Sequence, residues 1–247
     1  AKLEKPSAVA VGFLKRLDPF GRHNLVAIDP NGAGRLEGRT FEPGDWPAMA
    51  QWIDAREGRS NLYYSVNEPI AGASHSKLTK SDIAAVRAYH VDIDPKGGRD
   101  EFASERSSIL RRLEGSSPAP SLVVDSGGGF NALWKLERLL QGAEDKEQAE
   151  LQNAAVSRVL GGDTGTHNID RILRLPGTRN LPNAKKREKG REVAKARLLP
   201  SCDASYSTNA LAAAYPAHAA PLDPAAKVGR EGEIRCLQAS LDMYRVM

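Results

Sequence analysis

The sequence predicts an α+β fold built around a mixed sheet. Segments with helical and strand-like patterns of apolar residues alternate along most of the 247 residues. In the middle of the chain, two strand-like runs, residues 122–124 and 130–134, are joined by a glycine-rich segment, which is typical of an antiparallel hairpin. Because helices and a hairpin occur together, we expect a mixed sheet rather than a purely parallel one.

The remaining elements follow from the same patterns in chain order. Helical spacing with start and stop signals predicts the helices, and short apolar runs bounded by turn residues predict the strands. We expect helices at residues 7–17, 45–57, 79–88, 101–113, 145–160, 207–214 and 231–247. We expect strands at residues 23–28, 61–66, 90–94, 122–124, 130–134, 172–175 and 193–199.

The length and composition set the domain organisation. We expect residues 1–216 to form one domain that carries the chemistry, because the chain is long enough for one large core. Residues 217–226 are rich in Ala and Pro and predict a linker. Residues 217–247 would then be a linker and a C-terminal helical segment, leading to a further domain.

Charge and cysteine content exclude several classes of protein. The net charge of +4 is too small to indicate a nucleic-acid partner by itself. Cys202 and Cys236 lie far apart without metal-site spacing, which argues against a disulfide framework or zinc site and fits the reducing cytoplasm. Neither a signal peptide nor an apolar run of about 18 residues occurs, so we expect no membrane partner.

The strand at residues 90–94 carries the first candidate site. Side chains alternate along a strand, so His90, Asp92 and Asp94 share one face. Two carboxylates roughly 7 Å apart repel each other unless a cation lies between them, and Mg²⁺ uses such oxygen pairs together with substrate phosphates. The alternative is a polar strand end whose acids only cap a turn.

The hairpin turn is the second candidate site. Gly127, Gly128 and Gly129 follow Ser126 and allow a close approach of the backbone to a ligand. Exposed N–H groups in such a turn suit a phosphate, and Asn131 lies just beyond it. The alternative is a flexible hairpin tip that binds nothing.

A third segment places acids and arginines close together. Arg171 and Arg174 could hold a phosphate as a fork. Asp163 or Asp170 could add a third carboxylate to a metal site. The alternative is a charged loop whose salt bridges are internal.

A basic run follows at residues 185–191. Lys185, Lys186 and Arg187 predict either a solvated face or a surface that follows a nucleic-acid backbone. Aromatic residues for base stacking are not interleaved with these cations.

The order and spacing of these motifs resemble the archaeo-eukaryotic primase superfamily, in particular the RepB-like primase-polymerases of plasmids and phages. A hydrophobic-Asp-x-Asp-Pro strand at 91–95 comes first, and Ser-Gly-Gly-Gly-aromatic-x-x-x-Trp at 126–134 follows. An Asp…Arg-x-x-Arg-Leu-Pro-Gly-Thr-x-Asn segment with a following Lys, residues 163–185, comes last. The strand at 61–67 is also similar, and the resemblance spans about residues 10–200.

This resemblance implies a fold in which an α/β unit packs against an RNA-recognition-like mixed sheet, with the active site in the cleft between them. Asp92 and Asp94 match the acids that bind two divalent metals, and Asp163 is the better match to the third acid, with Asp170 as its rival. Asn131 stands where the family usually has a histidine that contacts the phosphates of the nucleotide. Asn donates a hydrogen bond but carries no positive charge.

The implied activity is template-dependent nucleotidyl transfer by a DNA primase with DNA-polymerase capacity. Mg²⁺ or Mn²⁺ would be the cofactor. Single-stranded DNA and nucleoside triphosphates would be the partners, with a helicase domain or replication protein as a further partner. The residues implied in nucleotide binding are Ser126, Gly127, Gly128, Gly129, Asn131, Arg171 and Arg174, and those implied in DNA binding are Lys185, Lys186 and Arg187.

Two other functions fit the same residues. A metal-dependent nuclease or phosphohydrolase could use His90, Asp92 and Asp94 as ligands. A replication-origin or single-stranded-DNA-binding module with weakened catalysis would explain the departure at Asn131.

Overall fold

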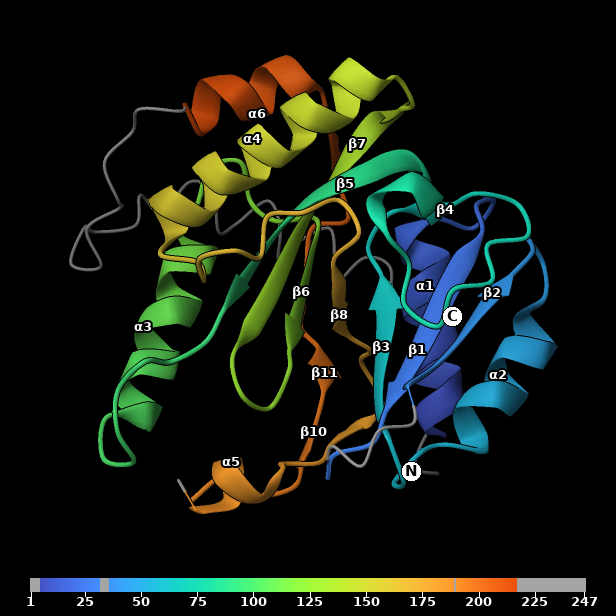
Figure 1. The fold of residues 1–247 in the computed structure, drawn as a ribbon. Helices are drawn as coiled ribbons and strands as arrows, with labels where there is room; N and C mark the ends of the chain where they lie inside the picture. Colours follow the sequence, from blue (N-terminus) through green and yellow to red (C-terminus); the bar gives the residue numbers. More distant parts are fainter. Residues whose placement is uncertain (1–4, 32–35, 189, 217–247) are drawn as a thin grey trace, which may run out of the picture.

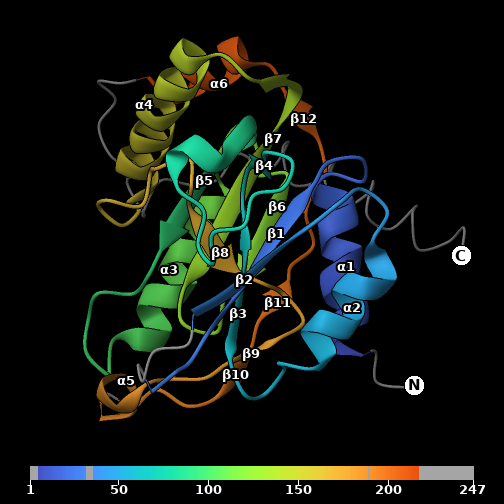
Figure 2. The same ribbon diagram turned by 45° about the vertical axis from the view of Figure 1, so that its right-hand side comes forward.

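The computed structural model describes residues 5–31, 36–188 and 190–216. This part of the chain contains two large β-sheets, with helices on the outer sides, and a small sheet of β9 and β10 (Figures 1 and 2). The predicted linker and helix in 217–247 lie outside the described residues. The helices are α1 (Pro6–Leu17), α2 (Trp46–Asp54), α3 (Phe102–Glu114), α4 (Ala143–Leu160), α5 (Ala184–Glu188) and α6 (Thr208–Ala214). The strands are β1 (His23–Ile28), β2 (Leu36–Phe41), β3 (Asn61–Ser65), β4 (Glu68–Pro69), β5 (Ile83–Ile93), β6 (Leu122–Asp125), β7 (Phe130–Leu140), β8 (Ile172–Arg174), β9 (Arg179–Asn180), β10 (Ala194–Lys195), β11 (Arg197–Leu198) and β12 (Ser205–Tyr206).

The first sheet has the strand order β2-β1-β3-β8, and its neighbours are antiparallel. Helices α1 and α2 lie beside it (Figure 1). Their apolar side chains, including Phe13, Leu14 and Ile53, join Leu25 and Tyr64 of the sheet in one buried cluster. This part of the chain is the α/β unit expected from the resemblance.

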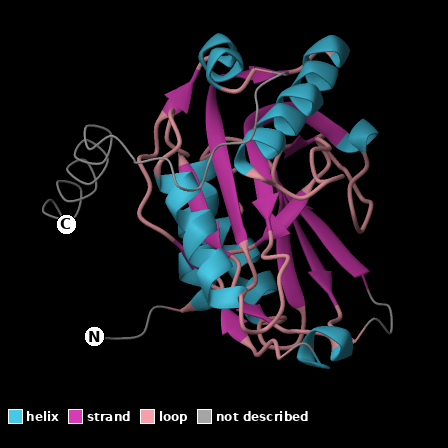
Figure 3. Cartoon of the chain, turned by 90° about the vertical axis from the view of Figure 1, so that its left-hand side faces the viewer, coloured by secondary structure: helices cyan, strands magenta, loops and turns pink. Residues whose placement is uncertain are grey.

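The second sheet has the order β11-β6-β7-β5-β4. It is mixed, as predicted, because β12 pairs with β7 in parallel while β5 and β6 each pair with β7 antiparallel. The hairpin of β6 and β7 confirms the expected strand pair around the glycines. Figure 3 shows the strands in the interior of the molecule with helices around them.

Strand β5 separates two environments. Val91 and Ile93 belong to the cluster that the second sheet forms with α3 and α4. Asp92 and Asp94, one residue out of phase, lie on the opposite face, as strand alternation requires. Leu133 of β7 packs with the first sheet on that same side. The acids therefore lie on the side of the second sheet that is directed toward the first sheet.

The prediction of a helix at residues 79–88 is wrong. The Thr79–Asp82 capping box is present, but it encloses only the single 3₁₀ turn Lys80–Asp82. Strand β5 begins directly afterwards, because residues 83–93 pair with β4 on one side and β7 on the other. A strand buried on both faces shows no clear periodicity, and its residues are almost all buried here.

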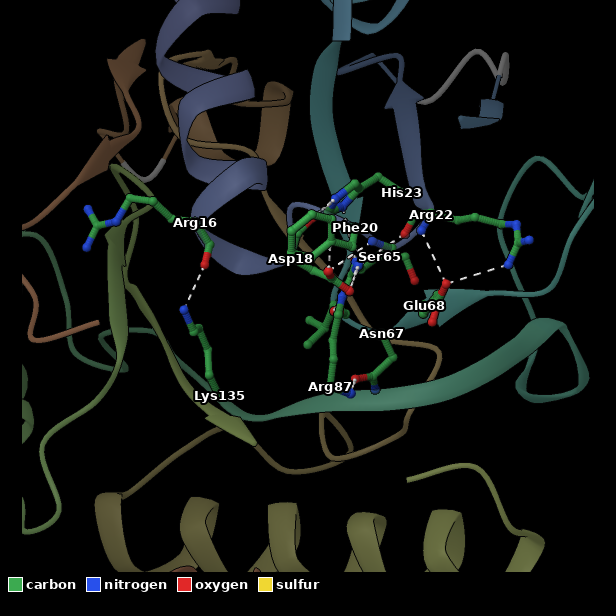
Figure 4. A network of polar contacts seen from close by, with 12 residues as sticks. Arg16, Asp18, Phe20, Arg22, His23, Ser65, Asn67, Glu68, Arg87 and Lys135 are labelled. Carbon is green, nitrogen blue, oxygen red and sulfur yellow. Dashed lines mark hydrogen bonds and ion pairs between the residues drawn. The ribbon is translucent and has the colours of Figure 1, made fainter. Parts of the chain in front are cut away.

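Arg87 of β5 ties the two sheets together (Figure 4). Its side chain is buried and donates to the carbonyls of Val66 at 2.8 Å and Arg22 at 3.1 Å. It also lies 3.2 Å from Nδ1 of His23, whose Nε2 is 2.8 Å from the Asp18 carbonyl. Burial and the Arg87 charge lower the pKa of His23, so the neutral ring accepts at Nδ1 and donates at Nε2. This network holds β5 against β3 and the α1–β1 connection.

Candidate active site

Three carboxylates gather at the end of β5. Asp92 is in the strand, Asp94 follows its last residue, and Asp163 comes from the loop that follows α4. The Asp163 N–H donates to the Asp92 carbonyl at 2.8 Å, which fixes the loop to the strand. Gly161, with φ +71°, ends α4 in the left-handed conformation and allows this turn.

The carboxylates raise each other's proton affinity. Desolvation of its carboxyl, followed by the charge of Asp92, raises the pKa of Asp94. Desolvation, followed by the charges of Asp94 and Asp92, raises the pKa of Asp163. Asp170 accepts a hydrogen bond from Asn168 at 2.6 Å instead. The structure thus groups Asp163, rather than Asp170, with the two acids of β5.

Asp92 is held by two side chains. Asn131 on β7 donates from Nδ2 to Oδ1 at 2.6 Å, and Arg171 donates from Nη2 to Oδ2 at 2.7 Å. The side chains of Asp92 and Arg171 are 19% and 28% exposed, so the ion pair is partly shielded from water. The register of β5 and β7 places Asn131 opposite Asp92.

The donor set fits a hard divalent cation in its chemistry. Carboxylate oxygens are the ligands that Mg²⁺ prefers. Burial, followed by the neighbouring carboxylates, raises the pKa values of Asp94 and Asp163, and a bound cation would offset both effects. The buried Oδ1 of Asn131 has no hydrogen-bond partner beside them. Among the residues that the structure describes, however, no three His, Cys, Asp or Glu side chains are arranged as a finished metal site.

The glycine turn packs directly against the acids. A Cβ on Gly129 would overlap the Ile93 carbonyl and the Asp94 carboxylate, so only glycine fits there. Gly127 has φ +80°, which also favours glycine. The turn therefore forms one wall of the site, in contact with Asp94.

The N–H groups of this turn are not free, in contrast to the expected phosphate nest. Gly127 donates to Asp125 Oδ1 at 2.8 Å. Gly128 and Gly129 donate to Ser126 Oγ at 3.3 and 2.9 Å. The Ser126 hydroxyl occupies the position that an anion would take, so a phosphate would have to displace it.

Arg171 and Arg174 do not form one fork. Arg171 reaches Asp92, whereas Arg174 on β8 is buried and donates to Asn61 Oδ1 at 2.8 Å. Its other nitrogen donates to the Tyr63 hydroxyl at 2.9 Å and to Asn180 Oδ1 at 3.0 Å. Burial lowers the pKa of Arg174, while Tyr63 and the acids on β5 counteract this effect.

Several residues of the site were not singled out by the sequence. Asn180 connects Arg174 to the glycine turn, because its Nδ2 donates to the Ser126 carbonyl at 2.8 Å. Arg106 of α3 also contacts the turn, because it donates hydrogen bonds to the Gly128 carbonyl at 3.1 Å and to the Asp125 carboxylate at 2.7 Å. Asn180 is the last residue of the Arg-x-x-Arg-Leu-Pro-Gly-Thr-x-Asn pattern, which could have indicated its role. No sequence pattern indicated Arg106.

The predicted basic run lies close to the acids. Lys185, Lys186 and Arg187 are exposed on α5. The charge of Lys186, followed by that of Arg191, counteracts the raised pKa of Asp94. The guanidinium of Arg191 also lies over the Phe102 ring, 3.3 Å from its centroid. Cations from this segment therefore reach the acidic cluster.

His90 does not face an open ligand position. Its Nε2 lies 2.9 Å from the Thr166 carbonyl, and its Nδ1 lies 3.3 Å from Asn153 Nδ2. Burial lowers the pKa of His90 to about 4, so the ring is neutral. Both ring nitrogens have protein partners, which removes support for His90 as a metal ligand of a nuclease.

Within the described part of the chain, no helix combines the length and apolarity needed to cross a membrane. No family model matches the sequence. No curated protein matches it either.

The fold is nevertheless similar to that of solved proteins. The AEP domain of the Cyanophage S-2L primase-polymerase has a TM-score of 0.56 and 16% identity, over 85% of this chain and 97% of that one. Primase RepB′ has a TM-score of 0.53 and 13% identity, over 98% of this chain and 64% of the solved chain. The catalytic domain of RepB′ in complex with initiator DNA has a TM-score of 0.51 and 13% identity, over 98% of this chain and 97% of that one. The chain therefore has the fold of the archaeo-eukaryotic primase-polymerase domains.

Proposed function

We propose that this protein is a template-dependent nucleotidyltransferase, a primase with DNA-polymerase capacity from a plasmid, phage or other mobile element. The observation that carries the proposal is the cluster of Asp92, Asp94 and Asp163 on the side of the second sheet that is directed toward the first, with Arg171 paired to Asp92. The fold of primase-polymerase domains supports it.

The three carboxylates would hold Mg²⁺ or Mn²⁺. Such ions, when bound, lower the pKa of an attacking 3′-hydroxyl and stabilise the leaving oxygens of pyrophosphate. Arg171 would supply a guanidinium to the triphosphate, and Asn131 a neutral donor from the neighbouring strand. The buried Arg174 would keep β8 and the glycine turn in place and add positive charge to the site.

Single-stranded DNA is the proposed template. One of the similar structures, the catalytic domain of primase RepB′, contains initiator DNA. In this chain, the exposed cations of α5 are the proposed contacts with the DNA backbone, because the charge of one of them, Lys186, acts on Asp94.

A primer-extension assay tests the proposed function. Primed and unprimed single-stranded templates are incubated with labelled nucleotides and Mg²⁺ or Mn²⁺. We expect extension or primer products with the wild type and none with Asp92→Ala or Asp94→Ala, both checked for folding by circular dichroism. Shortened DNA would identify a nuclease instead, and a folded Asp92→Ala variant with normal incorporation would contradict the two-metal assignment.

One observation favours a second candidate function, a DNA-binding module with weakened catalysis. Both oxygens of Asp92 already have protein partners, Asn131 and Arg171. The same assay separates the two functions, since the module would shift a labelled single strand in a gel but produce no extension with either metal.

A further inference from the structure

A groove of about 580 Å³ is lined in part by the basic segment at residues 185–191. Three parts of the chain that are distant in sequence form its walls: the end of the β1 region, the α2–β3 connection, and the segment from β9 through α5 to β10. Its volume is within the range of about 300–1,000 Å³ that is usual for ligand sites. Neither the sequence motifs nor the proposed catalytic cluster include it.

The groove carries net positive charge. Arg59, Arg187 and Arg191 line it, against a single acid, Glu192. Among the described residues, none of these three arginines takes part in an ion pair. Arginines on a surface without carboxylate partners are well suited to bind phosphates, because the guanidinium fork matches phosphate oxygens.

Apart from Asn31, the rest of the lining is apolar or glycine. Leu181 and Pro182 form one part of the wall, and Val193, with 59% of its surface exposed, forms another. Unpaired bases can stack on guanidinium planes, and aliphatic side chains offer them apolar contact. Arg187 donates to the Pro182 carbonyl at 2.8 Å and so lies along the wall of the groove. Arginines without carboxylate partners beside apolar walls fit a polymer with phosphates on one side and bare bases on the other, which is a single-stranded nucleic acid.

The groove continues to the acidic cluster through Arg191. This residue lines the groove and also lies over Phe102 of α3. The positive charge of Arg191 and the negative charge of Asp94 act on each other's pKa, so Arg191 lies between the groove and the acidic cluster. A strand that has its reacting end at the acids can therefore pass Arg191 on its way into the groove.

We propose that this groove binds the segment of single-stranded DNA adjacent to the nucleotide site, with Arg59 as its outermost phosphate contact. The proposal rests on the proposed function, since it takes the acidic cluster as the place where the strand is used. It adds a residue from the α2–β3 connection, 126 positions before Lys185 in the numbering, to the DNA-binding surface.

Arg59→Ala and Arg59→Glu test the groove, because this exposed side chain lies outside the catalytic cluster. Arg138→Ala is the matched control, since Arg138 is exposed near the C-terminal end of β7 and does not line the groove. Binding of fluorescent oligo(dT) is measured between 50 and 300 mM salt, chosen at roughly the range where phosphate contacts dominate. Melting temperatures verify folding.

We expect Arg59→Ala to lower the log–log salt slope by ~0.7 and the affinity about fivefold near 0.1 M salt, with a larger loss for Arg59→Glu and none for Arg138→Ala. Wild-type affinity and slope in both Arg59 variants would overturn the proposal. A loss of free deoxynucleotide binding without a loss of oligo(dT) binding would also overturn it, because the occupant would then be a mononucleotide.

Primer extension at saturating template separates this proposal from the function on which it rests. Extension by the wild type, together with normal oligo(dT) binding by the Arg59 variants, would remove the groove and leave the nucleotidyltransferase. If those variants bind oligo(dT) more weakly but the wild type does not extend a primer, the groove is supported as a DNA site and the proposed nucleotidyltransferase activity is contradicted.

Discussion

Arg171, just before β8 of the first sheet, donates a hydrogen bond of 2.7 Å to Asp92 on β5 of the second sheet. The two residues are 79 positions apart in the sequence. This ion pair joins the two sheets at the place where the proposed metals and triphosphate would bind. It places a cation beside the acids.

The first prediction concerns this ion pair. Arg171→Gln should lower the free energy of unfolding by about 1–3 kcal/mol, between the values for exposed and buried pairs. It should also bind Mn²⁺ more tightly than the wild type and bind nucleoside triphosphates more weakly, because Asp92 loses a competing cation and the triphosphate loses a guanidinium. Urea unfolding and titration calorimetry measure these effects. Unchanged nucleotide affinity in the folded variant would leave Arg171 a purely structural role.

The second prediction uses the raised pKa of Asp94. A carboxyl whose pKa is higher in the folded state binds more protons folded than unfolded, so it lowers stability as the pH rises through its titration range. In metal-free buffer, Asp94→Asn should therefore melt at a higher temperature than the wild type at pH 7. The difference should shrink as the pH falls below the raised pKa. A lower melting temperature at pH 7 would contradict this.

The third prediction compares two neighbouring glycines. A Cβ on Gly129 would overlap the Asp94 carboxylate, whereas one on Gly128 meets only ordinary contacts at 3.7 Å or more. Gly129→Ala should therefore lose stability and incorporation by displacing Asp94, and Gly128→Ala should retain both. Melting curves and primer extension on the two variants provide the comparison. Equal behaviour would show that the turn is free to move away from the acid.

The fourth prediction concerns Asn131, which is buried and bonded to Asp92. Asn131→Ala should reduce stability by about 1.5–3 kcal/mol, the usual value of a hydrogen bond to a charged group, and should weaken triphosphate binding. Asn131→His should bind triphosphates more tightly at pH 6 than at pH 8, because imidazole titrates between these values. If nucleotide affinity is the same in both variants, Asn131 serves only to position Asp92.

The fifth prediction concerns the cations of α5. Replacing Lys185 and Lys186 by Ala should weaken template binding and reduce its salt slope by ~0.7 for each lost phosphate contact with a single strand. Thermal stability should remain unchanged, because both side chains are exposed. A constant slope in the salt titration would identify α5 as a solvated face.

Much of this arrangement could be predicted from local sequence patterns. The alternation of Asp92 and Asp94 with apolar residues, ended by Pro95, placed the acids on one face of a strand. The glycines after Ser126 predicted the β6–β7 hairpin, and Gly161 marked the end of α4. These features depend on the two-residue period of a strand and on glycine's access to positive φ, which neighbouring residues determine by themselves.

The start of β5 and the partners of the polar side chains were decided by the tertiary structure. Residues 83–88 form a strand because β4 and β7 offer backbone partners on both sides, whatever the capping box before them favours. Arg174 finds Asn61 at a distance of 113 positions in the sequence. By contrast, the hydrogen bonds that Gly128 and Gly129 donate to the Ser126 hydroxyl are local. Backbone propensities act over a few residues, whereas a buried arginine or carboxylate must be paired by whatever the packing of the two sheets brings to it.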